Sequence, residues 1–148
     1  MTLLFPDLNV WLALSDGAHI HHAVARNWIA QLAGSDKLIF SRYTQIGLLR
    51  LLSNPAVMAD QVQTLKGAWQ IYDRWLDDPR VEFYLEPRGV DSTFRKMTRP
   101  LAAQPASKAI GDCWLLAFAA DIQATLVTFD HALYGHARKL GHSATIPS

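Results

Sequence analysis

Three aspartates, Asp7, Asp112 and Asp130, stand where the sequence predicts strand ends or a helix start. Residues 2–5 form an apolar run that predicts a short strand, and Asp7 lies just beyond its carboxyl end. Residues 125–128 predict a second strand, apolar as in buried parallel sheets, and Asp130 follows it. Ligands of open α/β sheets bind outside the carboxyl ends of the strands, so these carboxylates are candidates for a functional site.

Asp112 opens a predicted helix over residues 112–122. Its apolar residues recur at helical spacing, and no Pro or Gly interrupts them: Leu115, Phe118, Ala119 and Ile122. Asp112 is then either a third member of the acidic group or a helix N-terminal residue stabilised by backbone N–H groups and the helix dipole. The residues alone leave both interpretations open.

An acidic group of this kind predicts metal-dependent hydrolysis. Carboxylates at one rim repel each other unless they are protonated or bridged by a cation, and their hard oxygens suit Mg²⁺ or Mn²⁺. A divalent ion held in this way can activate water and stabilise the charge that develops on a phosphodiester. Neither the G-x-S-x-G nucleophile motif nor the Walker G-x-x-x-x-G-K-[ST] motif occurs, so we expect water to be the nucleophile.

Composition indicates one domain spanning residues 1–148, because half of the 148 residues are hydrophobic and can bury a core. The net charge of +1 excludes a nonspecific nucleic-acid coat protein, so any contact with nucleic acid must be local. No apolar run is long enough to cross a bilayer and no leader pattern precedes Asp7, so we expect a cytoplasmic protein with no membrane association. The single cysteine, Cys113, excludes an internal disulfide and is expected to be buried.

Strands and helices alternate along the chain, which predicts an α/β fold with a central, mainly parallel sheet flanked by helices. Further strands are expected at 38–40, 81–85 and 144–146, and helices at 8–14, 23–32, 42–53, 60–76, 91–102 and 131–140. The spacing predicts Val24, Trp28 and Leu32 as the buried face of helix 23–32. It likewise predicts Ile46, Leu49 and Leu52 for helix 42–53, and Asp60 as the cap of helix 60–76.

Polar side chains elsewhere offer weaker candidates. Gln45 lies near the start of helix 42–53, where a side chain can face the crevice. The basic residues that could pair with RNA phosphates are Arg42, Arg50, Arg95, Lys96 and Arg99. Solvated helix faces, ion pairs with the acids and a partner interface remain alternatives for them. His19, His21 and His22 suggest a metal site, but no further ligand falls nearby at helical spacing.

Four segments together resemble the PIN-domain ribonuclease toxins of the VapC family: PDLNVWLAL, HIHHAVARNW, SRYTQIGLLRLLSNPAV and AIGDCWLLAFAADIQATLVTFDHAL. The resemblance covers nearly the whole chain in the expected order. It implies a PIN-like α/β fold and a Mg²⁺- or Mn²⁺-dependent endoribonuclease that acts on structured RNA such as tRNA or rRNA. It also implies a VapB-like antitoxin that occupies the site, and a homodimer. The family's first, third and fourth acids fall on Asp7, Asp112 and Asp130.

One position departs from the family pattern, because Gln45 stands where we expect the second acid, often a glutamate. The carbonyl of Gln45 can coordinate a metal but adds no charge, so one ion held chiefly by Asp7 and Asp112 is expected. Asp130 would ligate that ion or orient its water. The histidines match a recurrent family feature, which favours a role in packing or at the surface over a zinc site.

Three other functions are compatible with parts of the sequence. A haloacid-dehalogenase-type phosphatase needs a second aspartate two residues after the first, where this chain has Asn9. A phospho-acceptor receiver domain needs adjacent acids after an early strand and a lysine after a late one, and neither is found. The third is a catalytically silent PIN module that binds a protein partner or RNA, which Gln45 alone supports.

Overall fold

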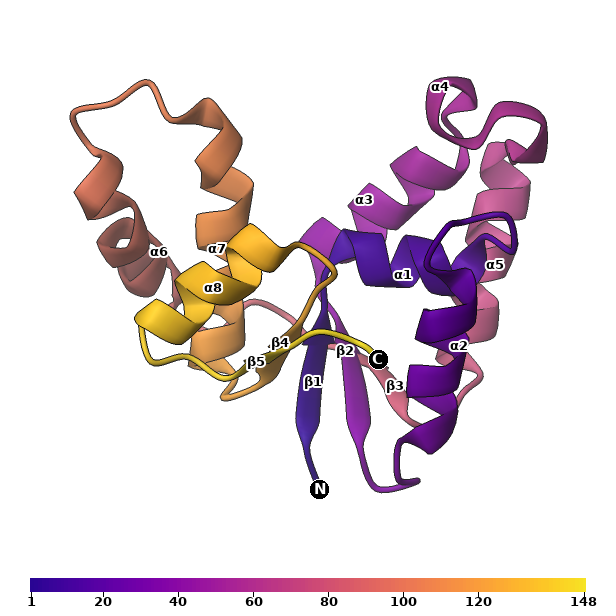
Figure 1. Ribbon diagram of the computed structural model, residues 1–148, viewed down its shortest axis with the longest axis horizontal. Coiled ribbons are helices and arrows are strands. Elements are labelled where there is room, and N and C mark those ends of the chain that lie inside the picture. The colour runs from indigo at the N-terminus through magenta and orange to yellow at the C-terminus, as the bar shows by residue number, and fades with distance from the viewer.

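A five-stranded sheet divides the molecule into two groups of helices in the computed structural model, which describes residues 1–148 (Figure 1). The strand order is β3-β2-β1-β4-β5, and every neighbouring pair is parallel. The strands are β1 (Leu3–Pro6), β2 (Lys37–Phe40), β3 (Val81–Phe83), β4 (Thr125–Val127) and β5 (Ala144–Thr145). The predicted parallel α/β fold is therefore confirmed, and all five carboxyl ends lie at one edge.

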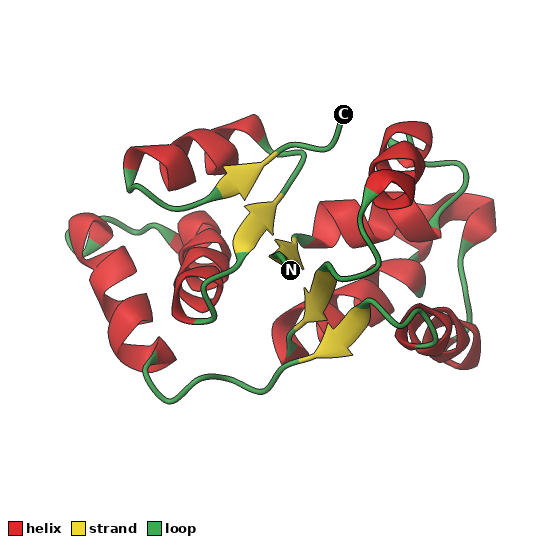
Figure 2. Ribbon diagram, turned by 90° about the horizontal axis from the view of Figure 1, so that it is seen from below, coloured by secondary structure: helices red, strands yellow, loops and turns green.

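Helices cover both faces of the sheet (Figure 2). One group contains α1 (Leu8–Ser15), α2 (His22–Gln31), α3 (Arg42–Leu52), α4 (Pro55–Met58), the 3₁₀ turn η1 (Ala59–Gln61) and α5 (Leu65–Leu76). The other contains α6 (Val90–Thr98), the 3₁₀ turns η2 (Arg99–Leu101) and η3 (Ser107–Ala109), α7 (Ile110–Asp121) and α8 (His131–Lys139). None of these helices combines the length and the apolar character that crossing a bilayer requires.

Each face of the sheet has its own apolar core, because successive strand residues point to opposite faces. In β1, Leu4 packs into the core beneath α1, α2, α3 and α5, and Phe5 packs into the core beneath α7 and α8. The first core is centred on Trp11, which is fully buried and stacks on Phe40 with ring centroids 3.9 Å apart. Cys113 is buried, as its place in an apolar helix predicted.

The long helix predicted over residues 60–76 is wrong at its start. Residues 55–61 instead form α4 and η1, and α5 begins only at Leu65. The hydroxyl of Thr64 accepts a hydrogen bond from the N–H of Gly67 at 3.1 Å, so Thr64 is the cap. Asp60 is exposed and caps nothing.

The buried faces of α2 and α3 are also rotated from those predicted. In α2 the buried residues are Ala25 and Ile29; of the predicted residues, Trp28 and Leu32 are partly buried against the first core, whereas Val24 is 37% exposed. In α3, Leu49 and Leu52 are buried as expected, but Ile46 is 45% exposed. Both helices carry apolar residues on more than one face, so spacing alone did not determine which face the sheet covers.

Candidate active site

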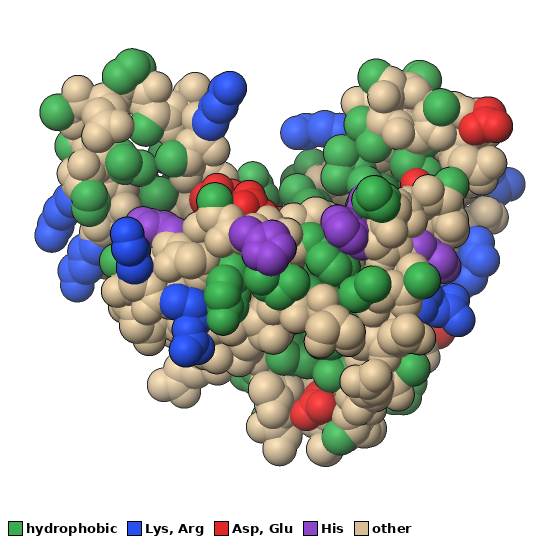
Figure 3. All heavy atoms as spheres, viewed as in Figure 1, with side chains coloured by type: hydrophobic (Ala, Val, Ile, Leu, Met, Phe, Trp, Pro, Cys, Tyr) green, Lys and Arg blue, Asp and Glu red, His purple; other side chains and the backbone are tan.

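A cleft opens above the carboxyl edge of the sheet, between the two groups of helices. Figure 3 shows acidic side chains at its floor and Lys or Arg side chains on both of its walls. Asp7 directly follows β1, Asp130 follows β4, and Asp112 lies in the first turn of α7. The structure thus brings the three aspartates to one edge, the arrangement that the sequence predicted.

Asp7 is the most buried of the three, with 8% of its surface exposed. Its Oδ1 accepts a hydrogen bond from the N–H of Leu8 at 2.6 Å, which caps α1, and its Oδ2 accepts one from the hydroxyl of Thr128 at 2.9 Å. Burial raises the pKa of Asp7 to about 6, the charges of Asp112 and Asp130 add to this rise, and the two hydrogen bonds oppose it. Asp7 is therefore a carboxylate whose negative charge is poorly stabilised by the protein.

Thr128 holds Asp7 and the loop after β4 together. It is fully buried, and its hydroxyl accepts hydrogen bonds from Asn9 Nδ2 at 3.3 Å and from the N–H of Asp130 at 3.0 Å. With its own donation to Asp7, this uses every hydrogen-bonding position of a hydroxyl. Asn9 Oδ1 accepts from the N–H of Phe129 at 3.1 Å, so Asn9 ties the start of α1 to the same loop.

Asp130 has a structural role in addition to its position at the site. Its Oδ1 accepts hydrogen bonds from the N–H groups of Ala132 at 2.9 Å and Leu133 at 3.1 Å, which caps α8. Its Oδ2 makes no hydrogen bond within the chain, and the residue is exposed. One oxygen of Asp130 therefore remains available to a ligand.

Asp112 differs from the other two because its carboxylate makes no hydrogen bond within the chain, although it lies in the first turn of α7. The helix-capping role that the sequence left open is thus not what holds this side chain. Partial burial raises the pKa of Asp112, the charge of Asp130 raises it further, and the charge of His136 opposes the rise. Asp112 is a desolvated acid without a partner.

The donor atoms at this edge fit a hard divalent cation, because they are all carboxylate oxygens. As the side chains stand, no group of three or more His, Cys, Asp or Glu side chains converges closely enough to hold a metal ion. Asp112 and Oδ2 of Asp130 make no hydrogen bond within the chain, and each oxygen of Asp7 accepts only one, so all three carboxylates keep acceptor positions for a cation. Burial first and mutual repulsion second raise the pKa of Asp7 and of Asp112, and a bound cation would offset both effects.

Gln45 does not belong to this group, which corrects the position expected for the second acid. It is 7% exposed and accepts a hydrogen bond from Arg42, and its side chain contacts the hydroxyl of Tyr72 in the first core. The side of α3 that faces the acids instead carries Tyr43 and, further along, Arg50. Helical geometry explains the correction, because residues two apart point in nearly opposite directions.

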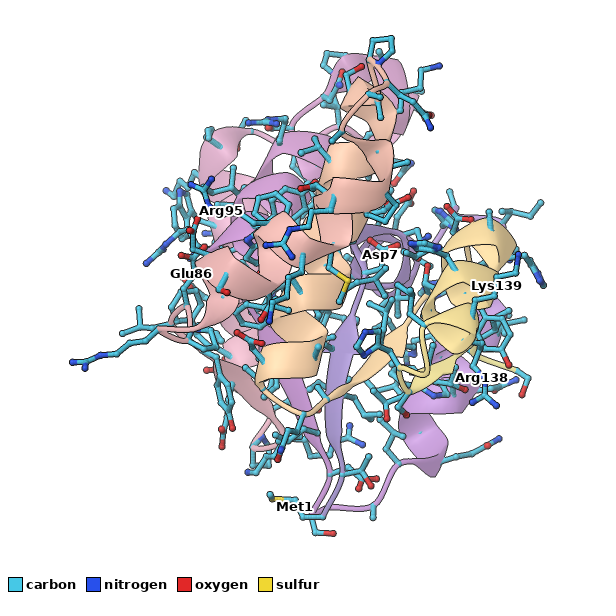
Figure 4. The ribbon with its side chains drawn as sticks, turned by 90° about the vertical axis from the view of Figure 1, so that its left-hand side faces the viewer. Met1, Asp7, Glu86, Arg95, Arg138 and Lys139 are labelled. Atoms are coloured by element: carbon cyan, nitrogen blue, oxygen red, sulfur yellow. The ribbon has the colours of Figure 1, made fainter.

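The five basic candidates separate into distinct environments. Arg42 lies over the ring of Phe83, 4.7 Å from its centroid, and Arg95 pairs with Asp91 at 2.9 Å on the surface of α6. Figure 4 shows Arg95 on α6, whose helix packs on α7. Arg50 lines a groove beside the acids. Lys96 and Arg99 are exposed, on α6 and η2.

The three histidines have packing roles. The ring of His21 stacks on Phe129 with centroids 4.4 Å apart, and Nδ1 of His22 lies 2.7 Å from the carbonyl oxygen of Ala13. Nδ1 of His19 accepts a hydrogen bond from the N–H of His21 at 3.0 Å. These contacts agree with the packing role favoured by the sequence.

Two residues of the site were not singled out in the sequence. Thr128 occupies the end of an apolar strand, where a buried threonine two residues before an aspartate is a usable signal for a loop-fixing hydroxyl. Tyr43 gives no such signal, since its role depends on the rotation of α3 about its axis.

Replacing Asp7 is expected to change how stability depends on pH. The pKa of about 6 in the folded protein exceeds the ordinary 3.8, so between these values the folded state binds more protons than the unfolded state. The free energy of unfolding of the metal-free protein should then fall as pH rises through this window, by up to about 3 kcal/mol. Asp112 contributes in the same direction.

The measurement is urea unfolding in EDTA between pH 4 and 7.5, for the wild type, Asp7→Asn and Asp60→Asn. Asp7→Asn should lose most of the fall, whereas Asp60→Asn, at an exposed position, should keep it. An equal fall in wild type and Asp7→Asn would contradict the burial of a charged Asp7.

Comparison with known proteins identifies the fold family. Residues 4–139 match the PIN domain family. Ribonuclease VapC41 of Mycobacterium tuberculosis is 36% identical over 134 residues, which cover 88% of this chain and 90% of VapC41. Ribonuclease VapC39 of the same species is 32% identical over 142 residues, covering 90% and 91%. A solved structure of VapBC-1 from nontypeable Haemophilus influenzae shares the fold, with a TM-score of 0.67 and 17% identity over 98% of each chain. The chain therefore belongs to the PIN-domain family and, within it, to the VapC ribonucleases.

Proposed function

We propose that this protein is the toxin of a VapBC-type toxin–antitoxin system and cleaves RNA, with Asp7, Asp112 and Asp130 as a site for Mg²⁺ or Mn²⁺. The observation that carries the proposal is the meeting of three carboxylates at one edge of a parallel sheet, one of them buried with a pKa near 6. The names of the two mycobacterial relatives support ribonuclease activity.

The chain's own residues suit a hydrolytic mechanism. Asp7 and Asp112 would hold the ion, and the free oxygen of Asp130 would ligate it or orient its water. The bound ion would supply an activated water and neutralise charge on the scissile phosphate. Thr128 keeps Asp7 and the loop of Asp130 in register, so the acids need not be organised anew when RNA binds.

Single-stranded or looped RNA would enter the cleft with its phosphates toward the basic walls seen in Figure 3. Because Arg42 and Arg95 already have partners within the chain, Arg50, Lys96 and Arg99 are the stronger candidates for phosphate contacts. We extend the proposal to tRNA or rRNA as the substrate class and to the cytoplasm as the location.

A protein partner and a second copy are part of the proposal. The VapBC-1 structure supports a VapB-like antitoxin as the partner. Large apolar side chains are exposed on α4, on α5 and in the segment just before α5, and they supply a surface for a homodimer: Val57, Val62, Leu65 and Trp69.

The test is cleavage of total bacterial RNA by the purified protein with Mg²⁺, with Mn²⁺ and with EDTA. Discrete fragments that form with either metal and disappear with EDTA are expected, and sequencing their ends would identify the target. Absence of cleavage by folded protein free of a copurified inhibitor would contradict the proposal. It would favour the catalytically silent binding module.

A further inference from the structure

A groove on α3 opens beside the acids, and the residues that line it are Leu8, Tyr43, Ile46, Gly47 and Arg50. Its volume is about 270 Å³. We propose that this groove binds the nucleotide next to the scissile phosphate, with the ring of Tyr43 stacking on its base and Arg50 pairing with its outer phosphate. This proposal rests on the ribonuclease function proposed above, and it assigns one side of the RNA path.

Tyr43 has the position and the exposure that such a contact requires. Its ring packs against Trp114 with centroids 5.0 Å apart, and yet 41% of the residue is exposed. The charges of Asp7 and Asp112 both act on its hydroxyl, so the phenol lies close to the acids. Burial, the first cause, and these two charges raise the pKa of Tyr43, so the phenol stays a neutral donor at physiological pH.

The chain leaves space for the Tyr43 ring in this position. A Cβ added to Gly111 would lie 2.5 Å from the hydroxyl oxygen of Tyr43, so the residue before Asp112 must lack a side chain for the phenol to stay where it is. Trp114, one turn further along α7, supports the ring and itself stacks on Phe118 at 5.1 Å. Tyr43 is therefore held by packing against α7, which favours a rigid platform for a base.

Arg50 provides the charge at the other end of the groove. It lies seven residues beyond Tyr43, two helical turns or about 10 Å along the same side of α3. It is exposed and takes part in none of the three ion pairs of the chain, and its charge acts on the hydroxyl of Tyr43. A flat aromatic ring next to the acids and an unpaired guanidinium beyond it match a base and a phosphate in that order.

The apolar lining between these two residues agrees with a base as the occupant. Ile46 is 45% exposed in the groove, and Gly47 approaches Leu8 so closely that an added Cβ would lie 2.4 Å from it. A side chain at position 47 would therefore fill the groove. Base–aromatic stacking tolerates any base, so the groove contributes affinity for single-stranded RNA without selecting a sequence.

The test uses a fluorescent RNA oligonucleotide with one site that the wild type cuts, chosen from the fragment ends of the total-RNA experiment. A second set of oligonucleotides carries an abasic nucleotide on one side of the cut or on the other. Steady-state cleavage is measured for wild type and for Tyr43→Ala, Tyr43→Leu, Tyr43→Phe, Arg50→Ala and Arg138→Ala. Arg138 is the matched control, since it is exposed on α8, away from Asp7 (Figure 4).

Tyr43→Ala and Tyr43→Leu should raise KM roughly ten-fold or more, with kcat changing less, and Tyr43→Phe should stay near wild type. An abasic nucleotide on one side of the cut should raise the KM of the wild type by a similar factor. The same nucleotide should raise the KM of Tyr43→Ala little further. Arg50→Ala should raise KM and lower the salt dependence of binding by about one ion, and Arg138→Ala should do neither. Tyr43→Leu keeps an apolar side chain against Trp114 and carries the test if Tyr43→Ala unfolds.

The outcomes separate this proposal from the one it rests on. Absence of metal-dependent cleavage by the wild type contradicts the ribonuclease function before any variant is compared. Cleavage by the wild type with unchanged KM in Tyr43→Leu and Arg50→Ala overturns the groove alone. Additive losses from Tyr43→Ala and from each abasic nucleotide would overturn the stacking.

Discussion

Asp112→Asn is expected to abolish metal-dependent RNA cleavage, lowering the rate roughly a thousand-fold or more. Asparagine keeps the shape of the side chain but removes the charge that the proposed metal needs. Because the carboxylate of Asp112 makes no hydrogen bond within the chain, the substitution removes no structural contact. Burial already disfavours its charged form, so the variant should be at least as stable as the wild type in EDTA.

Initial rates of oligonucleotide cleavage with Mg²⁺ and with Mn²⁺, together with thermal unfolding in EDTA, measure both parts of this result. Asp60→Asn is the control, since that residue is exposed and far along the chain from the acids. Asp130→Asn would be a less direct test, because Asp130 also caps α8 and the exchange alters the charge at that helix start as well as at the site. Retained cleavage in Asp112→Asn would remove Asp112 from the site.

Trp11→Ala is expected to give the largest loss of stability, about 3–5 kcal/mol of the free energy of unfolding. The indole is fully buried, stacks on Phe40 and lies 5.6 Å from the ring of Trp75. Its truncation would leave a cavity in the core that supports α1. Since α1 begins at Asp7, cleavage activity should fall along with stability.

A second substitution at this position separates packing from hydrogen bonding. Nε1 of Trp11 is a buried donor with no hydrogen-bond partner, and such a group costs about 1–3 kcal/mol. Trp11→Phe removes that donor while keeping an aromatic ring against Phe40, so it should cost less than half as much as Trp11→Ala. Urea unfolding at pH 7 measures both, with Leu85→Ala, 77% exposed, as the control. Equal losses in the two Trp11 variants would argue against an unsatisfied indole.

The sheet and the acids were predictable because strand ends are local features of the sequence. Asp7 directly follows the apolar run of β1, and Asp130 comes two residues after Thr128, at the end of the second apolar run. Each run predicts a strand, and each aspartate marks its carboxyl end. Parallel pairing then brings these ends to one edge without any further information. The residues alone left the role of Asp112 open, and the family resemblance assigned it to the acidic group.

The side of a helix that faces the site was not predictable in the same way. Helix α3 carries apolar residues on several faces, and its rotation is set by contacts with α1 and α5 that its own spacing does not encode. Gln45 and Tyr43 are two positions apart and point in nearly opposite directions, so the rotation of α3 decides which of them is buried and which faces the acids. The predicted start of α5 was wrong for a related reason, because Asp60 and Thr64 are both residue types that cap helices.

The hydrogen bond between Thr128 and Asp7 joins residues 121 positions apart, and β1 pairs directly with β4. During synthesis, Asp7 is added first and Asp130 follows 123 residues later. At about 5–20 residues per second, that interval lasts roughly 6 to 25 seconds. During this time β1 lacks one of its two neighbours and Asp7 lacks the hydroxyl that holds it, so the nascent chain has no complete acidic edge. The strand order therefore delays completion of the proposed nuclease site until the last part of the chain has been synthesised.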